Sequence, residues 1–309
     1  MKTGVQEICN ALKRLDSGFR RNDKTKDQPN FFTPSERAGV IFLNFLGNTS
    51  EFFVDRRWPK MGSATQTWEE RRRIESFDVD IRGRLRPQTL FAYLLNAAWN
   101  HAKSTVYGYE ELSARNLMWV LIKMQLIINR QPKWGDQVAI ETWGKRIERL
   151  YALRDFAMSS ASGEKMISAT SSWMVLDKTS GRPQRFHLKT DGFPWQPERE
   201  EIETDLQKVP ELRSGKQVAQ FRVQFSDIDV NRHVNSTRYL RWMIDSHSQE
   251  HLEEAELKAV DLSFLAEALP NDEVAVLSEG RGNTELCSIM RVSDNKELCR
   301  ARIEWRPSP

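Results

Sequence analysis

The amino-acid sequence predicts an α+β fold of two similar halves, each an antiparallel sheet packed on one long helix. Three observations predict it. In each half a strand pattern precedes one helical pattern and then a run of strands, without the strand–helix alternation typical of a parallel sheet. The same order recurs at an offset of 144 in residue number, which indicates a duplicated unit. The length of 309 residues is about what two domains need.

The first half begins with Phe77–Ile81, where apolar and polar residues alternate as in a half-buried strand. Pro87 is typical of a first helical turn, and apolar residues at helical spacing follow it through Lys103. Turn signals then separate four apolar runs. We expect strands at residues 118–129, 137–143, 150–159 and 167–176.

The second half repeats this order. Phe221–Phe225 alternates like the first strand, and a helical pattern runs from Val234 to about Leu252. Further strands are expected at residues 260–265, 274–279, 286–292 and 300–305. We therefore expect two domains, at residues 68–188 and 215–309, joined by a charged, proline-containing linker at residues 189–214.

The basic excess of the chain lies in residues 1–61. They hold 11 Lys and Arg against 7 Asp and Glu, an excess of four, whereas the whole chain has a net charge of only +3. Residues 15–23 resemble a bacterial intergenic repeat translated in frame. Our hypothesis is that residues 1–61 form a leader ahead of a true start at Met61, in a bacterial protein; a disordered basic tail is the alternative.

Composition narrows the class of protein. The longest apolar run, Val40–Leu46, is far shorter than the roughly 20 residues of a membrane span. Beyond residue 61 the net charge is −1 and no recognition motif occurs, so nucleic-acid binding is not expected. Only three cysteines occur, which suggests a reducing compartment, and we expect a cytoplasmic location.

Candidate chemistry lies ahead of the second helix, in residues 227–235. Asp229, Asn231 and His233 stand there at alternate positions, and the offset of 144 puts Leu85, Pro87 and Thr89 opposite them. The chemistry is therefore expected in the second half. A calcium loop is excluded because Arg232 and Arg238 stand where Gly and Glu are needed. No metal is expected, since no thiol or acid lies near His233 at ligand spacing; a turn that merely caps the helix stays open.

The motif Asp229-x-Asn231-x-His233-Val234-Asn235-x-x-x-Tyr239 resembles the signature of the acyl-acyl carrier protein (acyl-ACP) thioesterases. Segments of the first half resemble family segments in the same order: Asn116–Val120, Trp134–Asp136, Ile140–Trp143, Leu153–Phe156, Gly163–Glu164, Ala169–Trp173 and Arg182–Pro183. The resemblance covers about residues 68–305. It implies two tandem hotdog domains, each an antiparallel sheet wrapped on a long helix.

The resemblance also implies an activity, hydrolysis of fatty acyl-ACP to free fatty acid in fatty acid biosynthesis, with no cofactor. Acyl carrier protein is then the partner, and a homodimer stays open. The family's catalytic Asp, Asn and His match Asp229, Asn231 and His233, and its further acidic residue matches Glu267. Plant members carry a Cys directly after that Glu, where this chain has Ala268, so a cysteine nucleophile is not expected there.

Direct attack by water suits this residue set, because a thioester carbonyl is electrophilic and a thiolate leaves readily. Glu267 would orient or deprotonate water, with His233 as the second acid–base group. Asn231 would hold the water or the carbonyl, and Asp229 would fix its neighbours. Backbone N–H groups at the start of the second helix are candidate oxyanion donors.

Trp99, Met118 and Trp119 are candidates for binding the acyl chain, although ordinary core packing explains each of them as well. An acidic carrier protein would dock on basic side chains. Two candidate sets are Lys145, Arg146, Arg149 and Arg154, and Arg232, Arg238 and Arg241. Two other functions stay open: an acyl-CoA thioesterase with the same site, and a hotdog protein that binds acyl thioesters without turnover.

The leader hypothesis predicts that a chain starting at Met61 folds with the stability and activity of the full chain. Thermal unfolding and a thioesterase assay on both chains check this. Loss of folding in the shorter chain would contradict the hypothesis, because residues 1–61 would then be part of the packed structure.

Overall fold

The computed structural model describes residues 66–105, 107–184, 193–203 and 208–308. The first half opens with strand β1 (Trp68–Arg73) and a 3₁₀ turn, η1 (Ser76–Asp78), followed by helices α2 (Pro87–Lys103) and α3 (Tyr109–Ala114). Its remaining strands are β2 (Leu117–Ile128), β3 (Gln137–Glu148), β4 (Tyr151–Ser160) and β5 (Lys165–Asp177). The predicted leader lies outside the described residues, as does part of the predicted linker.

The second half repeats the first with a shorter helix. It comprises β6 (Lys216–Arg222), η2 (Phe225–Asp227), α4 (Ser236–Asp245), α5 (Gln249–Glu254), β7 (Ala255–Phe264), β8 (Glu273–Arg281), β9 (Thr284–Arg291) and β10 (Lys296–Pro307). The helix predicted through Leu252 thus breaks at residues 246–248. Ser248 ends the break as the N-cap of α5, where its side chain accepts the amide hydrogen of His251.

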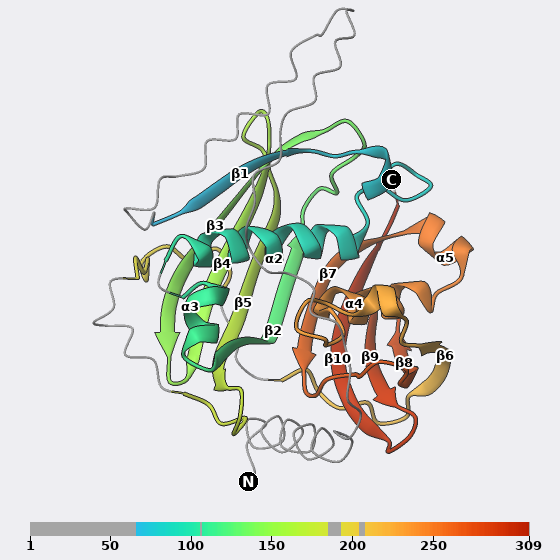
Figure 1. Ribbon diagram of the computed structural model, residues 1–309. Helices are drawn as coiled ribbons and strands as arrows, with labels where there is room; N and C mark the ends of the chain where they lie inside the picture. The colour runs from blue at the N-terminus through green and yellow to red at the C-terminus, as the bar shows by residue number, and fades with distance from the viewer. Residues whose placement is uncertain (1–65, 106, 185–192, 204–207, 309) are drawn as a thin grey trace, which may run out of the picture.

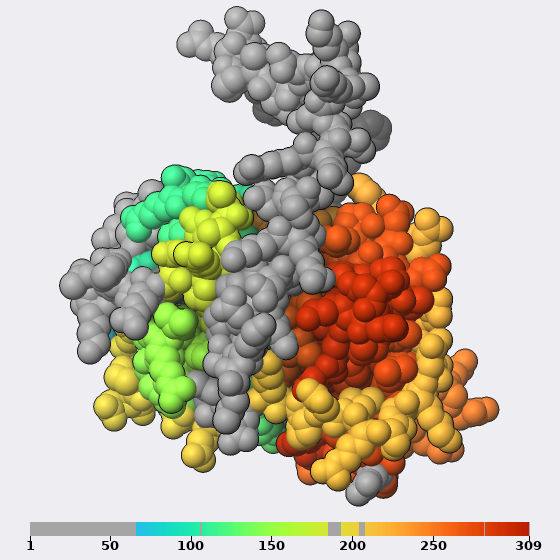
Figure 2. Space-filling model, turned by 90° about the horizontal axis from the view of Figure 1, so that it is seen from below, coloured from blue at the N-terminus to red at the C-terminus, as the bar shows by residue number. Residues whose placement is uncertain are grey.

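All ten strands form one antiparallel sheet in the order β1-β3-β4-β5-β2-β7-β10-β9-β8-β6. The two half-sheets join where β2 pairs with β7, from Lys123 opposite Ser263 to Ile127 opposite Ala259. Helices α2 and α4 lie on the same face of this sheet, one over each half (Figure 1). This is the predicted α+β architecture of two hotdog halves, and Figure 2 shows the halves side by side from below.

The two halves share one hydrophobic core. Helix α2 contributes Phe91, Leu94 and Ala97, all fully buried, and this group is continuous with Leu240 and Met243 of α4. Helix α2 has the predicted bounds, from Pro87 at its first turn to Lys103. Its apolar stripe buries against the sheet, which accounts for most of its stability because helix propensity alone is a weak determinant.

The first predicted strand of each half is misplaced. Phe77 and Ile81 are 91% and 75% exposed, and the chain there forms η1 and a turn rather than a strand. The true edge strand is β1, whose charged residues alternate between half-buried and exposed positions. In the second half β6 ends at Arg222, and Phe225 is exposed in η2. Alternation of apolar and polar residues suits such a loop as well as a strand.

The hydrogen bonds also correct the register of the duplication. The isolated bridge between Val79 and Leu85 recurs between Ile228 and Val234, so the offset in residue number is 149 rather than 144. In both loops an aspartate amide donates to the carbonyl four residues on at 2.8 Å, from Asp80 in one and Asp229 in the other. Both loops also contain a positive φ, at Gly83 and at Arg232.

The first-half counterparts of Asp229, Asn231 and His233 are therefore Asp80, Arg82 and Arg84. The prediction that Leu85, Pro87 and Thr89 stand opposite them, and that this position is apolar, is wrong. The histidine nevertheless belongs to the second half alone, because the first-half loop carries arginine in its place.

Arg84 has a different task from that of the histidine. Its buried guanidinium bonds the Asp80 carboxylate at 2.9 Å and the Leu252 and Ala255 carbonyls at 2.7 and 3.3 Å. The Glu256 carboxylate lies 3.8 Å away. The first-half loop is thereby fastened to α5 and β7 of the second half.

Replacing Arg84 with Met should therefore destabilise the protein by about 3–5 kcal/mol, because it leaves buried acceptors and a buried carboxylate without their donor. Urea unfolding measures the change. The control Arg71→Met, at a well-exposed ion pair with Glu69, should stay within about 0.5 kcal/mol of wild type. Equal effects of the two substitutions would contradict the role given to Arg84.

Candidate active site

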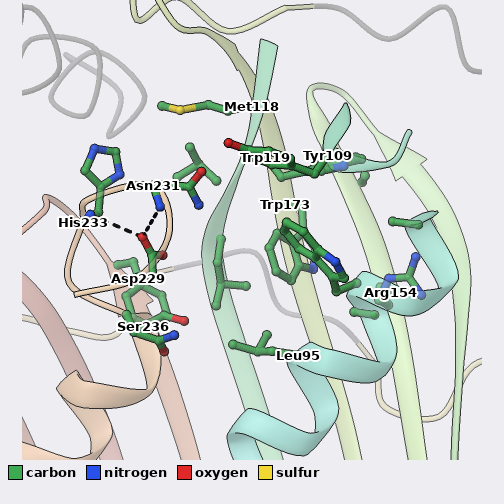
Figure 3. Close-up of a pocket in the computed structure, with 18 of the residues that line it drawn as sticks. Leu95, Tyr109, Met118, Trp119, Arg154, Trp173, Asp229, Asn231, His233 and Ser236 are labelled. Carbon is green, nitrogen blue, oxygen red and sulfur yellow. Dashed lines mark hydrogen bonds between the residues drawn. The ribbon is translucent and has the colours of Figure 1, made fainter. Parts of the chain in front are cut away.

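A cavity of about 770 Å³ lies between the two halves and is lined by both. The first half contributes side chains from α2, α3, β2, β4 and β5. The second half contributes the loop before α4, the first turn of α4, the end of β7 and the segment after β7. Figure 3 shows His233, Asn231 and Asp229 on one side of the cavity, with Trp173 and Arg154 on the other. All seven site residues predicted from the sequence line it: Trp99, Met118, Trp119, Asp229, Asn231, His233 and Glu267.

Asp229 organises the loop that carries the histidine. Its Oδ1 accepts the backbone N–H groups of Asn231 at 2.8 Å and His233 at 3.3 Å, the two dashed lines of Figure 3. Arg232, between them, has a φ of 64°. This left-handed conformation is uncommon for a residue other than glycine, and the carboxylate stabilises it by satisfying two amides of the turn. Asp229 therefore acts on the backbone of its neighbours.

Glu267 reaches the same point from the segment that follows β7. The amides of Leu265 and Ala266 both donate to the Leu298 carbonyl, which turns the chain so that Glu267 faces the cavity. Its Oε1 lies 3.4 Å from Nδ1 of His233. The structure thus brings together two titratable groups that lie on separate elements, one before α4 and the other after β7.

The surroundings of Glu267 disfavour its ionised form. Burial is the largest influence and raises the pKa of its carboxyl above the ordinary value, with a further increase from Asp229. His233 and Arg291 oppose this and lower the pKa. Oε2 of Glu267 is buried without a hydrogen-bond partner among the described residues. A buried carboxylate oxygen with a free lone pair can accept a proton or a hydrogen bond from a bound water.

Helix α4 begins beside this pair. Asn235 is its N-cap, and the Asn235 side chain accepts the amide hydrogen of Thr237 at 3.0 Å. The Arg238 amide donates to the Asn235 carbonyl. Within the described part of the chain the Ser236 amide has no acceptor, and Ser236 lines the cavity. That amide, at the positive end of the helix dipole, can stabilise a developing negative charge.

The first half supplies an aromatic wall. Trp119 and Trp173 meet edge to face with ring centroids 6.3 Å apart, and Nε1 of Trp119 donates to the Tyr107 carbonyl at 3.0 Å. Trp99 stacks on Tyr109 at 5.5 Å and is 47% exposed. Trp99 is therefore not a core residue, so the alternative that its position reflects ordinary core packing is wrong. A wall of this composition accepts an apolar chain.

Arg154 also lines the cavity, which the sequence pattern did not indicate. Its Nη1 contacts Nδ1 of His101 and Oγ1 of Thr142, both at 3.0 Å. Burial lowers the pKa of Arg154 to about 10. Lys145, from the same predicted docking set, is fully buried against Asp155. The expectation that these two cations belong to a docking surface is wrong, because both lie inside the protein.

The cysteines stand apart from this site. Cys287 and Cys299 are buried in β9 and β10, neither lines the cavity, and burial raises the pKa of both thiols. They stay protonated and unreactive. Ala268 is also buried. Cys9 lies outside the described residues.

Among the described residues, no group of three or more His, Cys, Asp or Glu side chains is placed to hold a metal ion. In the same residues, no helix is long and apolar enough to cross a membrane.

Both halves match models of one protein family. Residues 65–188 match the acyl-ACP thioesterase N-terminal domain, and residues 211–307 match the acyl-ACP thioesterase C-terminal domain. A chloroplastic acyl-[acyl-carrier-protein] hydrolase of Cuphea viscosissima is 29% identical over 258 residues, which is 76% of this chain and 61% of the relative. Chloroplastic oleoyl-acyl carrier protein thioesterase 2 of Arabidopsis thaliana is 26% identical, over 78% of this chain and 77% of the relative. The chain thus spans about three fifths of the length of the first relative.

Solved structures of acyl-ACP thioesterases are similar to this chain. An acyl-ACP thioesterase from Bacteroides thetaiotaomicron has a TM-score of 0.72 and 25% identity, covering 78% of this chain and 98% of its own. The 12:0-ACP thioesterase from Umbellularia californica, at 23% identity, has the same fold with a TM-score of 0.72, over 80% of this chain and all of its own.

The raised pKa of Glu267 predicts a stability effect with a definite sign. A carboxyl whose pKa is higher in the folded state than in the unfolded state lowers the stability as pH rises through that folded pKa. Glu267→Gln, which mimics the protonated form, should therefore be more stable than wild type at pH 8 by about 0.5–2 kcal/mol. The difference should shrink toward pH 4.

Urea unfolding at both pH values measures this effect. A less stable Glu267→Gln at pH 8 would mean that the interactions of the carboxylate with His233 and Arg291 outweigh the cost of burying it.

Proposed function

This chain belongs to the acyl-ACP thioesterase family, and we propose that it hydrolyses the thioester of fatty acyl-acyl carrier protein. The products are a free fatty acid and the carrier with its thiol restored. One observation carries the proposal: an apolar cavity of about 770 Å³ is lined by tryptophans of one half and by the His233–Glu267 pair of the other. An acyl chain fits the wall, and its thioester carbonyl then meets the pair.

Hydrolysis at this pair needs no covalent intermediate. The Glu267 carboxylate takes a proton from a water as the water oxygen forms a bond to the thioester carbon. The developing oxyanion receives hydrogen bonds from the Ser236 amide and the Asn231 side chain. The carbon–sulfur bond then breaks, and the leaving thiolate takes a proton that His233 supplies. The 3.4 Å separation of His233 and Glu267 supports a proton passing between them to reset the site.

The carrier protein docks, in this proposal, on the second-half loop at the mouth of the cavity. Arg232 is exposed there, and in the described part of the chain it makes no ion pair. Arg238 and Arg241 of α4 both lie close to the Asp227 carboxylate, at 3.5 and 3.8 Å, so their charge is partly neutralised. An acidic partner is drawn to such a rim by electrostatics.

A cytoplasmic location, a bacterial origin and a homodimeric assembly are further proposals. The free thiols of Cys287 and Cys299 support a reducing compartment. The first relatives named above are chloroplastic proteins, so the compartment of this chain needs its own measurement by fractionation.

Turnover of acyl-ACPs of several chain lengths tests the activity. His233→Ala and Glu267→Ala should each lower kcat by about 10²–10⁴-fold, the scale of losing a general acid or base. His251→Ala and Glu254→Ala, which replace the same residue types outside the cavity, serve as matched controls and should keep wild-type rates. Near-normal turnover by either cavity variant would overturn its role.

Hydrolysis of the same acyl chain attached to coenzyme A and to acyl carrier protein shows which carrier the enzyme prefers. We expect a higher kcat/KM on the carrier protein. Equal or faster hydrolysis of the acyl-CoA would favour an acyl-CoA thioesterase. Tight binding of both thioesters without turnover would favour a non-catalytic binding protein.

A further inference from the structure

The turn that carries Glu267 is itself duplicated. In the first half the Lys133 amide donates to Oδ2 of Asp136 at 3.0 Å, and in the second the Leu269 amide donates to Oδ2 of Asp272 at 2.8 Å. Gly135 and Asn271 occupy the same place with φ of 88° and 69°. These pairs share an offset of 136 in residue number, smaller than the 149 of the preceding loops because the stretch between loop and turn is shorter in the second half.

The offset of 136 also pairs Gln131 with Glu267. Two hydrogen bonds to one carbonyl precede each of them: Asn129 and Arg130 donate to Met166, as Leu265 and Ala266 donate to Leu298. The first half is thus an internal reference for the second. It has the same turn, with the uncharged side-chain amide of Gln131 in place of the Glu267 carboxyl.

Two contacts to the second turn come from residues whose first-half counterparts cannot make them. The Ala268 amide donates to the Tyr239 hydroxyl at 2.8 Å, and the Arg291 guanidinium donates to the Glu267 carbonyl. Tyr239 is the fourth residue of α4, and the fourth residue of α2 is Leu90.

The counterpart of Arg291 follows from strand pairing. Arg291 pairs with Val274, the second residue of β8. The second residue of β3, Val138, pairs with Ser160, so Ser160 is the first-half counterpart of Arg291.

Leu90 has no hydroxyl, and Pro132, which corresponds to Ala268, has no amide hydrogen to donate. Ser160, which corresponds to Arg291, carries no guanidinium. Both contacts at this turn therefore belong to the copy that carries Glu267.

Tyr239 connects the two parts of the site. It is buried, and its ring meets Trp242 and Phe264 edge to face. Helix α4 begins directly after the His233 loop, so the hydroxyl of Tyr239 fixes the backbone next to Glu267 relative to that loop. Removing the Tyr239 hydroxyl would leave the buried Ala268 amide without an acceptor, at a cost of about 1–3 kcal/mol. We therefore expect the turn to move when this hydroxyl is absent.

Arg291 holds the same turn through the Glu267 carbonyl. Its Nε lies 2.8 Å from Oδ2 of Asp272, and its Nη1 lies 3.1 Å from Oδ2 of Asp294. With two carboxylates fixing its orientation, the guanidinium restrains the Glu267 carbonyl in the manner of a planar, multidentate clamp.

We propose that Tyr239 and Arg291 are positioning residues, which hold the Glu267 carboxylate against His233. The proposal rests on the function given above for Glu267. Neither residue is assigned a proton or a bond to the substrate. They act through the backbone on either side of Glu267.

The effect of Arg291 on Glu267 can be measured separately through the pKa of Glu267. Asp229 and His233 lie on the loop before α4, Tyr239 on α4 and Arg291 on β9. Of these, Arg291 and His233 lower the pKa of Glu267, against the effects of burial and Asp229. The pKa of the Tyr239 hydroxyl is strongly raised by burial, so it stays neutral. Removing the cation at position 291 should therefore raise the pH at which Glu267 ionises.

The experiment compares wild type with Tyr239→Phe, Arg291→Gln and Arg291→Lys on one acyl-ACP. Tyr239→Phe and Arg291→Gln should lower kcat about 10- to 100-fold, a part of the loss expected for the base itself, with KM within about threefold. The acid limb of the pH profile should move to higher pH in Arg291→Gln and return toward wild type in Arg291→Lys. A merely structural role would not move that limb.

Two substitutions serve as controls. Arg306→Gln removes a guanidinium that donates to the Ile128 and Asn129 carbonyls, just before the first-half turn. Tyr151→Phe removes a half-buried hydroxyl from β4. Both should keep the wild-type acid limb. Wild-type kcat and acid limb in folded Tyr239→Phe and Arg291→Gln would overturn the proposal, as would an equal limb shift in Arg306→Gln.

A substrate-free measurement separates this proposal from the proposed function. The imidazole resonances of His233 report the ionisation of Glu267 during a pH titration followed by NMR. We expect that step at higher pH in Arg291→Gln than in wild type and Arg291→Lys. This result would stand even if wild type hydrolysed no acyl-ACP, and an unmoved step would overturn the role of Arg291 even in an active enzyme.

Discussion

The pairing of β2 with β7 is the interaction on which the rest of this structure depends. Five consecutive residue pairs, from Lys123 with Ser263 to Ile127 with Ala259, turn two half-sheets into one. The buried Lys123 ammonium also lies 3.1 Å from the Asp261 carboxylate across this seam. Because the seam places α2 and α4 on one face, the cavity between the halves has a wall from one and titratable groups from the other.

The duplication shows one loop in two uses. Asp80 and Asp229 organise the same backbone with the same hydrogen bonds. The residue four positions on is Arg84 in one copy, where it fastens the halves together, and His233 in the other, where it faces the cavity. A guanidinium stays charged and satisfies several carbonyls at once, whereas an imidazole gains and loses a proton near neutral pH. One side chain therefore decides whether the loop serves stability or chemistry.

The site also combines costs and compensations that differ between its two sides. Glu267 is half-buried with its Oε2 atom fully covered, and its ionised form is supported by His233 and Arg291. On the far side, Arg154 is a buried cation that contacts His101 and Thr142 among the described residues. Charged groups with little access to water reduce the stability of a folded protein unless neighbouring polar groups compensate for the lost hydration. Both Glu267 and Arg154 line the cavity.

The sequence by itself determined the α+β class, the bounds of α2, the approximate positions of eight strands, and seven residues that line the cavity. These follow from period, turn chemistry and a motif, which are local properties. Tertiary structure alone decided the register of the duplication, the edge strands and the burial of Lys145 and Arg154. Alternation with a period of two fits several registers equally, whereas the bridges and hydrogen bonds of the two loops fix the offset at 149. Burial of a cation depends on which elements pack over it, and that is set by the β2–β7 seam.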